Sequence, residues 1–296
     1  MSFIRNNKII TIILVIFSIY VYYNFTRPIE VNELVDRSSM SYVNDLYASK
    51  ERIYNEHLNT KEKQMYRLIL NNSKNYNASI NINPNDFDCN SNDECSTLIA
   101  PAFEALSADH PELMNQSGYK WSYKENELKI KLNLKFAVKT PFVEQIAILK
   151  IQRMISDIKI ATKDMTDLEK IYYVYDWIGK SSYDHGFTYA SKNQSIYNVF
   201  IKEQAVCTAF AKSSQVIFQN IGIESFIVTG DSTGPHMWNI IKYNDKYYYY
   251  DSTYAAGTKN KKSENYYKGL VQEEMNFYTM NYPEWYPKIE QTNVFR

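Results

Sequence analysis

Three residues in the second half of the chain carry side chains that could together perform acyl transfer. Cys207 offers a thiol nucleophile, His236 an imidazole that can move a proton, and Asp251 a carboxylate that can orient the imidazole. We assign Cys207 as nucleophile, His236 as general base and then general acid, and Asp251 as orienting partner. These roles require the three side chains to meet, which depends on the elements that carry them.

A predicted hairpin brings His236 and Asp251 to one face of a sheet. Residues 236–253 read HMWNIIKYNDKYYYYDST, with Asn-Asp at 244–245. Asn and Asp tolerate the positive φ angles that a two-residue turn needs. With that turn Trp238 stands opposite Asp251, and because side chains alternate along a strand, His236 and Asp251 share a face. A register slip of one residue would place them on opposite faces.

A predicted helix carries Cys207 at its N-terminus. Apolar residues recur at roughly helical spacing along residues 206–221, and Gly222 is a favourable C-terminal cap. Unpaired N–H groups and the helix dipole stabilise a thiolate at such a position. The backbone N–H of Cys207 could donate to an oxyanion. Gln204 and Tyr183 are candidates for a further oxyanion or substrate contact.

Each of these residues also has a structural interpretation. A cysteine on an apolar helix is usually a core residue, and a lone histidine at the start of a strand is usually structural. Asp251 precedes Ser-Thr and could cap a turn. Trp238 is either a core aromatic residue or a wall of the substrate site. The order of Cys, helix, strand, His and Asp on a consistent face favours the catalytic interpretation.

The other periodic segments predict a mixture of helices and strands. Thr60 can cap a helix, and residues 127–136 alternate apolar and polar side chains as a half-buried strand does. Residues 166–169 fit a capping box before another helix. A short apolar strand is expected over 223–229, with Gly230 ending it.

Two further cysteines bracket a short polar loop. Cys89 and Cys95 enclose CNSNDEC and could form a disulfide outside the cytoplasm, the alternative being two free thiols. A zinc site is disfavoured because no second pair of Cys or His residues with ligand spacing accompanies them. The chain also lacks a Gly-rich phosphate loop. We therefore predict no metal and no cofactor.

The N-terminus predicts a membrane anchor. Residues 9–25 are free of charge, Gly and Pro, and as a helix they would span roughly 25 Å. Arg5 and Lys8 precede them, which predicts a cytoplasmic N-terminus and an extracytoplasmic remainder in a single-pass cell-membrane protein. A cleaved signal peptide is the main alternative, although no small-x-small cleavage site follows; a buried core helix is another. Lys+Arg and Asp+Glu are equal at 33 each, so nothing indicates a nucleic-acid partner.

The chain resembles the transglutaminase-like superfamily, whose papain-like core carries Cys, His and Asp in this order. The matching segments are YYVYDWIGKSSYD at 172–184, SIYNVF at 195–200, AVCTAFA at 205–211, NIGIESFIVTG at 220–230 and residues 236–253. EALSADHPEL at 104–113 is similar to a segment upstream of this core in bacterial members. Ala209 stands where the family usually has Gly, and Ser252 where it usually has Pro.

The resemblance implies an α+β fold with a papain-like transglutaminase core, in which the helix bearing Cys packs on an antiparallel sheet bearing His and Asp. We expect an anchor in 1–27, an N-terminal α+β region and stalk in 28–160, and a catalytic domain in 161–296. The resemblance also implies thiol acyl transfer or hydrolysis at peptide or Gln side-chain amides, with protein or cell-wall peptide as the substrate. The alternative is a catalytically silent surface module that binds peptide or glycan.

Overall fold

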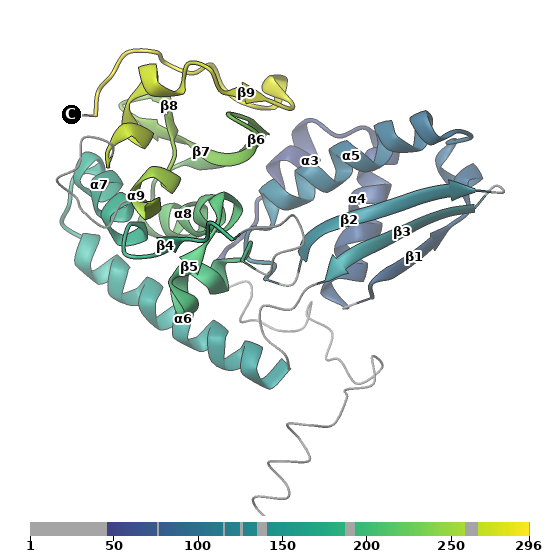
Figure 1. The fold of residues 1–296 in the computed structure, drawn as a ribbon, viewed down its shortest axis with the longest axis horizontal. Helices are drawn as coiled ribbons and strands as arrows, with labels where there is room; N and C mark the ends of the chain where they lie inside the picture. Colours follow the sequence, from purple (N-terminus) through teal and green to yellow (C-terminus); the bar gives the residue numbers. More distant parts are fainter. Residues whose placement is uncertain are drawn as a thin grey trace, which may run out of the picture.

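The computed structural model describes residues 46–75, 77–114, 116–124, 127–134, 141–186, 193–257 and 266–295. The anchor predicted at residues 9–25 lies outside these ranges. Among the described helices, none combines the length and apolar character needed to cross a bilayer. The expected mixture of helices and antiparallel sheets is confirmed, and Figure 1 shows it as two parts that lie side by side.

The first part is a three-stranded antiparallel sheet covered by helices (Figure 1). Its elements are α3 (Arg52–Glu56), α4 (Thr60–Lys74), β1 (Ser79–Ile82), a 3₁₀ turn (Pro84–Phe87), α5 (Asn92–Asp109), β2 (Gln116–Lys124) and β3 (Glu127–Leu134). The strand order is β1-β3-β2, and apolar side chains of α4, α5 and β3 form one core, with Met65, Ile99 and Leu128 fully buried. Cys89 and Cys95 lie in this core and are joined by a disulfide.

Two helix starts show how well local capping signals predict helices. The capping box predicted at Thr166 and Glu169 is present at the start of α7 (Asp167–Ile178). The Thr60 prediction was one residue off, because Asn59 is the cap of α4. The Asn59 side chain accepts from the Glu62 N–H at 3.0 Å, and the Glu62 carboxylate accepts from the Asn59 N–H at 2.8 Å. Because a capping box needs Glu or Gln at the third helical position, Glu62 makes Asn59 the N-cap in place of Thr60.

The second part places helices on a four-stranded antiparallel sheet. Its elements are α6 (Pro141–Thr162), α7, β4 (Ser182–Tyr183), a π-helical turn (Asn198–Lys202), β5 (Gln204–Ala205), α8 (Cys207–Ile221), β6 (Ser225–Asp231), β7 (Pro235–Tyr243), β8 (Lys246–Tyr250), α9 (Thr253–Gly257), three 3₁₀ turns (Lys268–Leu270, Gln272–Met275, Pro283–Trp285) and β9 (Thr279–Met280). The sheet order is β8-β7-β6-β9, and β4 pairs in parallel with β5. Helix α8 packs on β6 and β7.

Helix α6 shares its core with the helices that follow it. Ile151 of α6, Val174 of α7 and Phe210 of α8 are fully buried in one apolar cluster. The boundary expected after residue 160 thus falls inside α6, two residues before it ends at Thr162. The domain limits themselves stay a prediction.

The hairpin has the predicted register. Tyr243 pairs with Lys246 and Asn239 with Tyr250, and the turn residues 244–245 have φ angles of 48° and 59°. The next pair along this ladder would be Trp238 and Asp251, as expected from the sequence. A one-residue slip, which would have separated the two functional side chains, is therefore absent from this hairpin.

The prediction that Gly230 ends a strand was wrong. Strand β6 continues to Asp231, and Gly230 pairs with His236 on one side and Met280 on the other. A Cβ at this position would overlap the carbonyl oxygen of Thr279. Glycine is present here because β9 approaches the β6 backbone closely.

Candidate active site

Cys207 is the first residue of α8, as the sequence predicted. It is the free cysteine among the three, and its side chain is partly exposed. The N-cap residue, Val206, provides no side-chain cap for the first N–H groups of the helix, although the Ala209 N–H donates to the Val206 carbonyl. The thiol is thus both reachable and placed at the electropositive end of a helix.

His236 and Asp251 form a close pair at the edge of the hairpin. His236 lies on β7 and Asp251 directly follows β8, and His236 Nε2 is 2.7 Å from Asp251 Oδ2. The side chains are 12% and 2% exposed, so the pair is largely shielded from water. A charge-assisted hydrogen bond in such a setting holds the ring in one orientation.

Asp251 is fully buried, and both of its carboxylate oxygens are occupied. Oδ1 accepts from the backbone N–H of Thr253 at 2.9 Å. Oδ2 accepts from the Tyr278 hydroxyl at 2.7 Å as well as from His236. Burial by itself would raise the pKa of Asp251, but the charge of His236 and these hydrogen bonds outweigh it and the pKa is lowered. Asp251 is therefore held as a carboxylate.

His236 is poised as an imidazolium. Burial lowers its pKa, but the charge and hydrogen bond of Asp251, together with a hydrogen bond to Cys207, raise it to about 10. Asp251 occupies Nε2, so Nδ1 is the ring nitrogen that remains for another partner. The structure thus pairs His236 with Asp251, and Cys207 lies near enough to His236 to affect its pKa.

Two aromatic rings enclose the imidazole. Trp238 is buried and lies nearly parallel to His236, with ring centroids 5.9 Å apart and an interplanar angle of 17°. Tyr278 meets His236 edge-on at 5.6 Å and 89°. Trp238 therefore walls the imidazole rather than offering an open substrate contact. Tyr278 was missed in the sequence, because no motif or periodic pattern links it to the hairpin.

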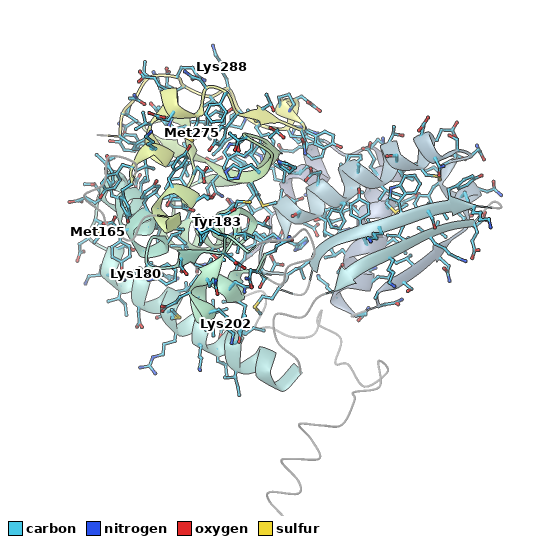
Figure 2. All side chains as sticks on the ribbon, in the orientation of Figure 1. Met165, Lys180, Tyr183, Lys202, Met275 and Lys288 are labelled. Atoms are coloured by element: carbon cyan, nitrogen blue, oxygen red, sulfur yellow. A yellow bond between two sulfur atoms is a disulfide. The ribbon has the colours of Figure 1, made fainter. Side chains whose placement is uncertain are left out.

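The two remaining candidates lie on the strands before α8. Tyr183, labelled in Figure 2, is half-buried on β4. Burial raises the pKa of its hydroxyl, and the charges of Cys207 and Asp251 add to the rise, so Tyr183 lies near the thiol. Gln204 is exposed on β5. The roles of both residues in binding substrate or an oxyanion stay predictions.

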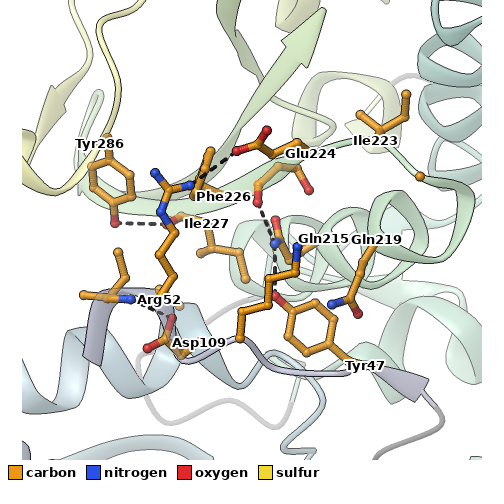
Figure 3. A pocket seen from close by; sticks show the side chains of 15 residues that line it. Tyr47, Arg52, Asp109, Gln215, Gln219, Ile223, Glu224, Phe226, Ile227 and Tyr286 are labelled. Carbon is orange, nitrogen blue, oxygen red and sulfur yellow. Dashed lines mark hydrogen bonds and ion pairs between the residues drawn. The ribbon is translucent and has the colours of Figure 1, made fainter. Parts of the chain in front are cut away.

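A separate cavity lies away from the three catalytic candidates. It has a volume of about 270 Å³, and its lining includes Arg52, Asp109, Gln215 and Phe226 (Figure 3). The guanidinium of Arg52 stacks on Phe226 at 4.1 Å and contacts Glu224 at 3.4 Å. These contacts join the two parts of the molecule across the cavity. The described residues include no group of three or more His, Cys, Asp or Glu that could hold a metal ion.

One family model matches part of the chain. Residues 157–252 match the family model described as the transglutaminase-like superfamily. The resemblance expected from the sequence is confirmed over this segment. Cys207, His236 and Asp251 all lie inside the matched residues of the transglutaminase-like core, whereas Tyr278 lies beyond them.

Two solved structures resemble the chain at low sequence identity. One is described as the crystal structure of a TGase, with 15% identity, a TM-score of 0.34 and coverage of 51% of this chain and 48% of the other. The second is named "putative cysteine protease" from Cytophaga hutchinsonii, with 14% identity, a TM-score of 0.29 and coverage of 46% and 61%. The chain thus spans about half to three fifths of these relatives. No curated protein matches.

Proposed function

We propose that the protein is a transglutaminase-like cysteine enzyme that acts on peptide or Gln side-chain amides. The observation that carries the proposal is the position of Cys207 as the first residue of α8, together with the imidazole of His236, which Asp251 holds at 2.7 Å and whose pKa Cys207 helps to raise. The raised pKa of His236 favours an imidazolium beside the sulfur, which in turn favours the thiolate.

The proposed reaction proceeds in two acyl transfers. The Cys207 thiolate attacks the amide carbonyl carbon, and the electron pair moves onto the oxygen, where the Cys207 N–H can donate to it. His236 then gives its proton to the departing amine or ammonia as the C–N bond breaks, which leaves a thioester on Cys207. Water or a Lys amine next attacks the thioester, His236 takes the attacking group's proton, and the thiolate leaves.

The proposed substrates are protein or cell-wall peptides outside the cytoplasm. The buried disulfide between Cys89 and Cys95 supports an oxidising compartment. Anchoring through residues 9–25 rests on the sequence alone and is part of the same proposal. A silent peptide- or glycan-binding module is the competing function, and the contact of His236 with Asp251 together with the place of Cys207 at the start of α8 favours the enzyme.

Mass spectrometry of peptides containing Gln and Lys separates these possibilities. The protein is incubated with the mixture, and Cys207→Ala serves as the control that removes only the sulfur. Hydrolysis of a peptide bond splits a peptide, deamidation changes a Gln to Glu, and cross-linking joins two peptides with loss of ammonia. We expect at least one of these changes with the wild type and none with Cys207→Ala. Unchanged peptides that nevertheless bind equally to both proteins would support the binding module.

A further inference from the structure

Tyr278 contacts the carboxylate that orients His236. Its hydroxyl donates to Asp251 Oδ2 at 2.7 Å, and the same oxygen lies 2.7 Å from His236 Nε2. Burial raises the pKa of the Tyr278 hydroxyl, with the charge of Asp251 adding to the rise, so the hydroxyl keeps the proton that it donates. The Tyr254 hydroxyl is hydrogen-bonded to that of Tyr278. Asp251 is thus held by a donor that does not belong to the hairpin.

The ring of Tyr278 also limits how the imidazole can move. It stands edge-on to His236, and edge-on to Trp238 with centroids 4.9 Å apart. Trp238 covers one face of the imidazole by stacking. The rings of Tyr278 and Trp238 therefore restrict the imidazole of His236 from two directions. The hydroxyl of Tyr278 also restricts Asp251, the hydrogen-bond partner of that imidazole.

The segment that carries Tyr278 is fixed by contacts with both parts of the molecule. After Tyr278, β9 runs beside β6 at the sheet edge near α5 (Figure 1), and the Asn281 N–H donates to the Thr229 carbonyl at 3.0 Å. The Asn281 side chain donates to Glu104 Oε1 of α5 at 2.6 Å. Trp285 is buried in the core of the first part. The residues of this segment, Tyr278 to Trp285, lie outside residues 157–252, the matched core, although β6 lies inside it.

We propose that Tyr278 is a positioning residue that acts on His236 through Asp251, and that the segment 276–286 fastens it to the first part of the molecule. The catalytic meaning of this role rests on the proposed function. Without the hydroxyl, Oδ2 keeps one donor in place of two, so Asp251 accepts a proton at higher pH and turns more freely. A protonated or turned carboxyl no longer holds the imidazolium beside the thiol.

The test measures alkylation of Cys207 by iodoacetamide in the full chain, from about pH 4 to about pH 9. Because the other two cysteines are bonded to each other, the reaction reports on Cys207. For Tyr278→Phe we expect the acid-side midpoint of the curve of alkylation rate against pH to rise by about one pH unit. We also expect the alkylation rate at neutral pH to fall about tenfold. Tyr286→Phe is the matched control, since its hydroxyl donates to the Ile227 carbonyl in the same segment.

Two outcomes would overturn the inference. One is a Tyr278→Phe profile that superimposes on the wild type, and the other is an equal shift in Tyr286→Phe, which would indicate general loosening. Thermal unfolding verifies that each variant is folded. Asn281→Ala is a second variant, which loosens the segment without removing the hydroxyl and should shift the midpoint in the same direction by less.

These results are separable from those for the proposed function. Peptides left unchanged by a protein whose alkylation still depends on Tyr278 would contradict the enzymatic function and support the positioning role. Conversion of peptides, together with identical alkylation profiles for the wild type and Tyr278→Phe, would support the enzymatic function and contradict the positioning role. A flat profile shared by the wild type and Tyr278→Phe would mean that no imidazolium activates the thiol, and the positioning role would be wrong.

Discussion

Asp251 Oδ2 lies 2.7 Å from His236 Nε2, although 15 positions separate the two residues in the chain. Their meeting follows from the hairpin, whose ladder pairs Asn239 with Tyr250 and so aligns the positions just beyond it. The contact places a buried carboxylate against an imidazole whose pKa Cys207 also helps to raise. The chemistry of this site therefore depends on strand register as much as on residue type.

Substitutions of Asp251 should separate charge from hydrogen bonding. Asp251→Ala leaves His236 Nε2 without an acceptor, and we expect the rate of amide conversion to fall by about a hundredfold or more. Asp251→Asn keeps an oxygen that can accept from His236 and Tyr278 and should cost about tenfold. Steady-state rates of the two variants check this. Equal losses would show that the carboxylate charge, not its acceptor geometry, is what His236 requires.

Folding stability should depend on pH through His236. The pKa of this imidazole rises from its ordinary value of 6.5 to about 10 in the folded chain. The imidazolium therefore binds its proton more tightly in the folded chain than in the unfolded one. The resulting stabilisation is fully present below about pH 6.5 and is lost as the pH rises through about 10.

Urea unfolding of the wild type and His236→Gln measures this dependence. Other groups titrate in the same range, including Lys212, whose pKa burial lowers to about 8, so the difference between the two proteins is the informative quantity. We expect the free energy of unfolding of the wild type to fall faster than that of His236→Gln between about pH 7 and 10. Parallel curves would contradict the raised pKa.

Gly230 should be intolerant of a side chain. A Cβ there would overlap the Thr279 carbonyl and lie 2.9 Å from the Trp238 ring, so Gly230→Ala must push β9 away. We expect a loss of about 3 kcal/mol in the free energy of unfolding, together with slower alkylation of Cys207 as Tyr278 moves.

Gly222→Ala is the matched control for that substitution. Gly222 has φ +82° but open space around it, so alanine should cost about 1 kcal/mol by backbone strain and leave alkylation unchanged. Chemical denaturation and the alkylation rate are measured on both variants. A Gly230→Ala protein as stable as Gly222→Ala would contradict the close approach of β9.

The disulfide should stabilise the first part of the molecule. Cys89 and Cys95 are six positions apart, and opening so short a loop costs about 2 kcal/mol in the chain-entropy account. A thiol reductant should therefore lower the unfolding temperature of the wild type. The double variant Cys89→Ala with Cys95→Ala should already melt lower and show no response to reductant. If reductant lowered the unfolding temperature of the double variant equally, the reductant would not be acting through this disulfide.

Local signals in the sequence account for much of the site. The capping box at Thr166 and the glycine cap at Gly222 predicted their helix ends, because capping depends on residues within one turn. The Asn-Asp turn at 244–245 predicted the hairpin register for the same reason. The helix start near Asn59 was misplaced because two neighbouring residues, Asn59 and Thr60, can both serve as the N-cap. The strand end at Gly230 was misplaced because a distant strand, β9, approaches the backbone there.

The sequence by itself determined which side chains could do chemistry, and that His236 and Asp251 share a face. Turn type and alternation are properties of adjacent residues, so no tertiary contact was needed to infer them. Only the tertiary structure decided that Trp238 closes over the imidazole and that Tyr278 holds Asp251. Tyr278 reaches Asp251 across 27 positions, through a segment fastened by β6, α5 and the first core. Contacts of that kind arise from packing between distant segments, which no local pattern encodes.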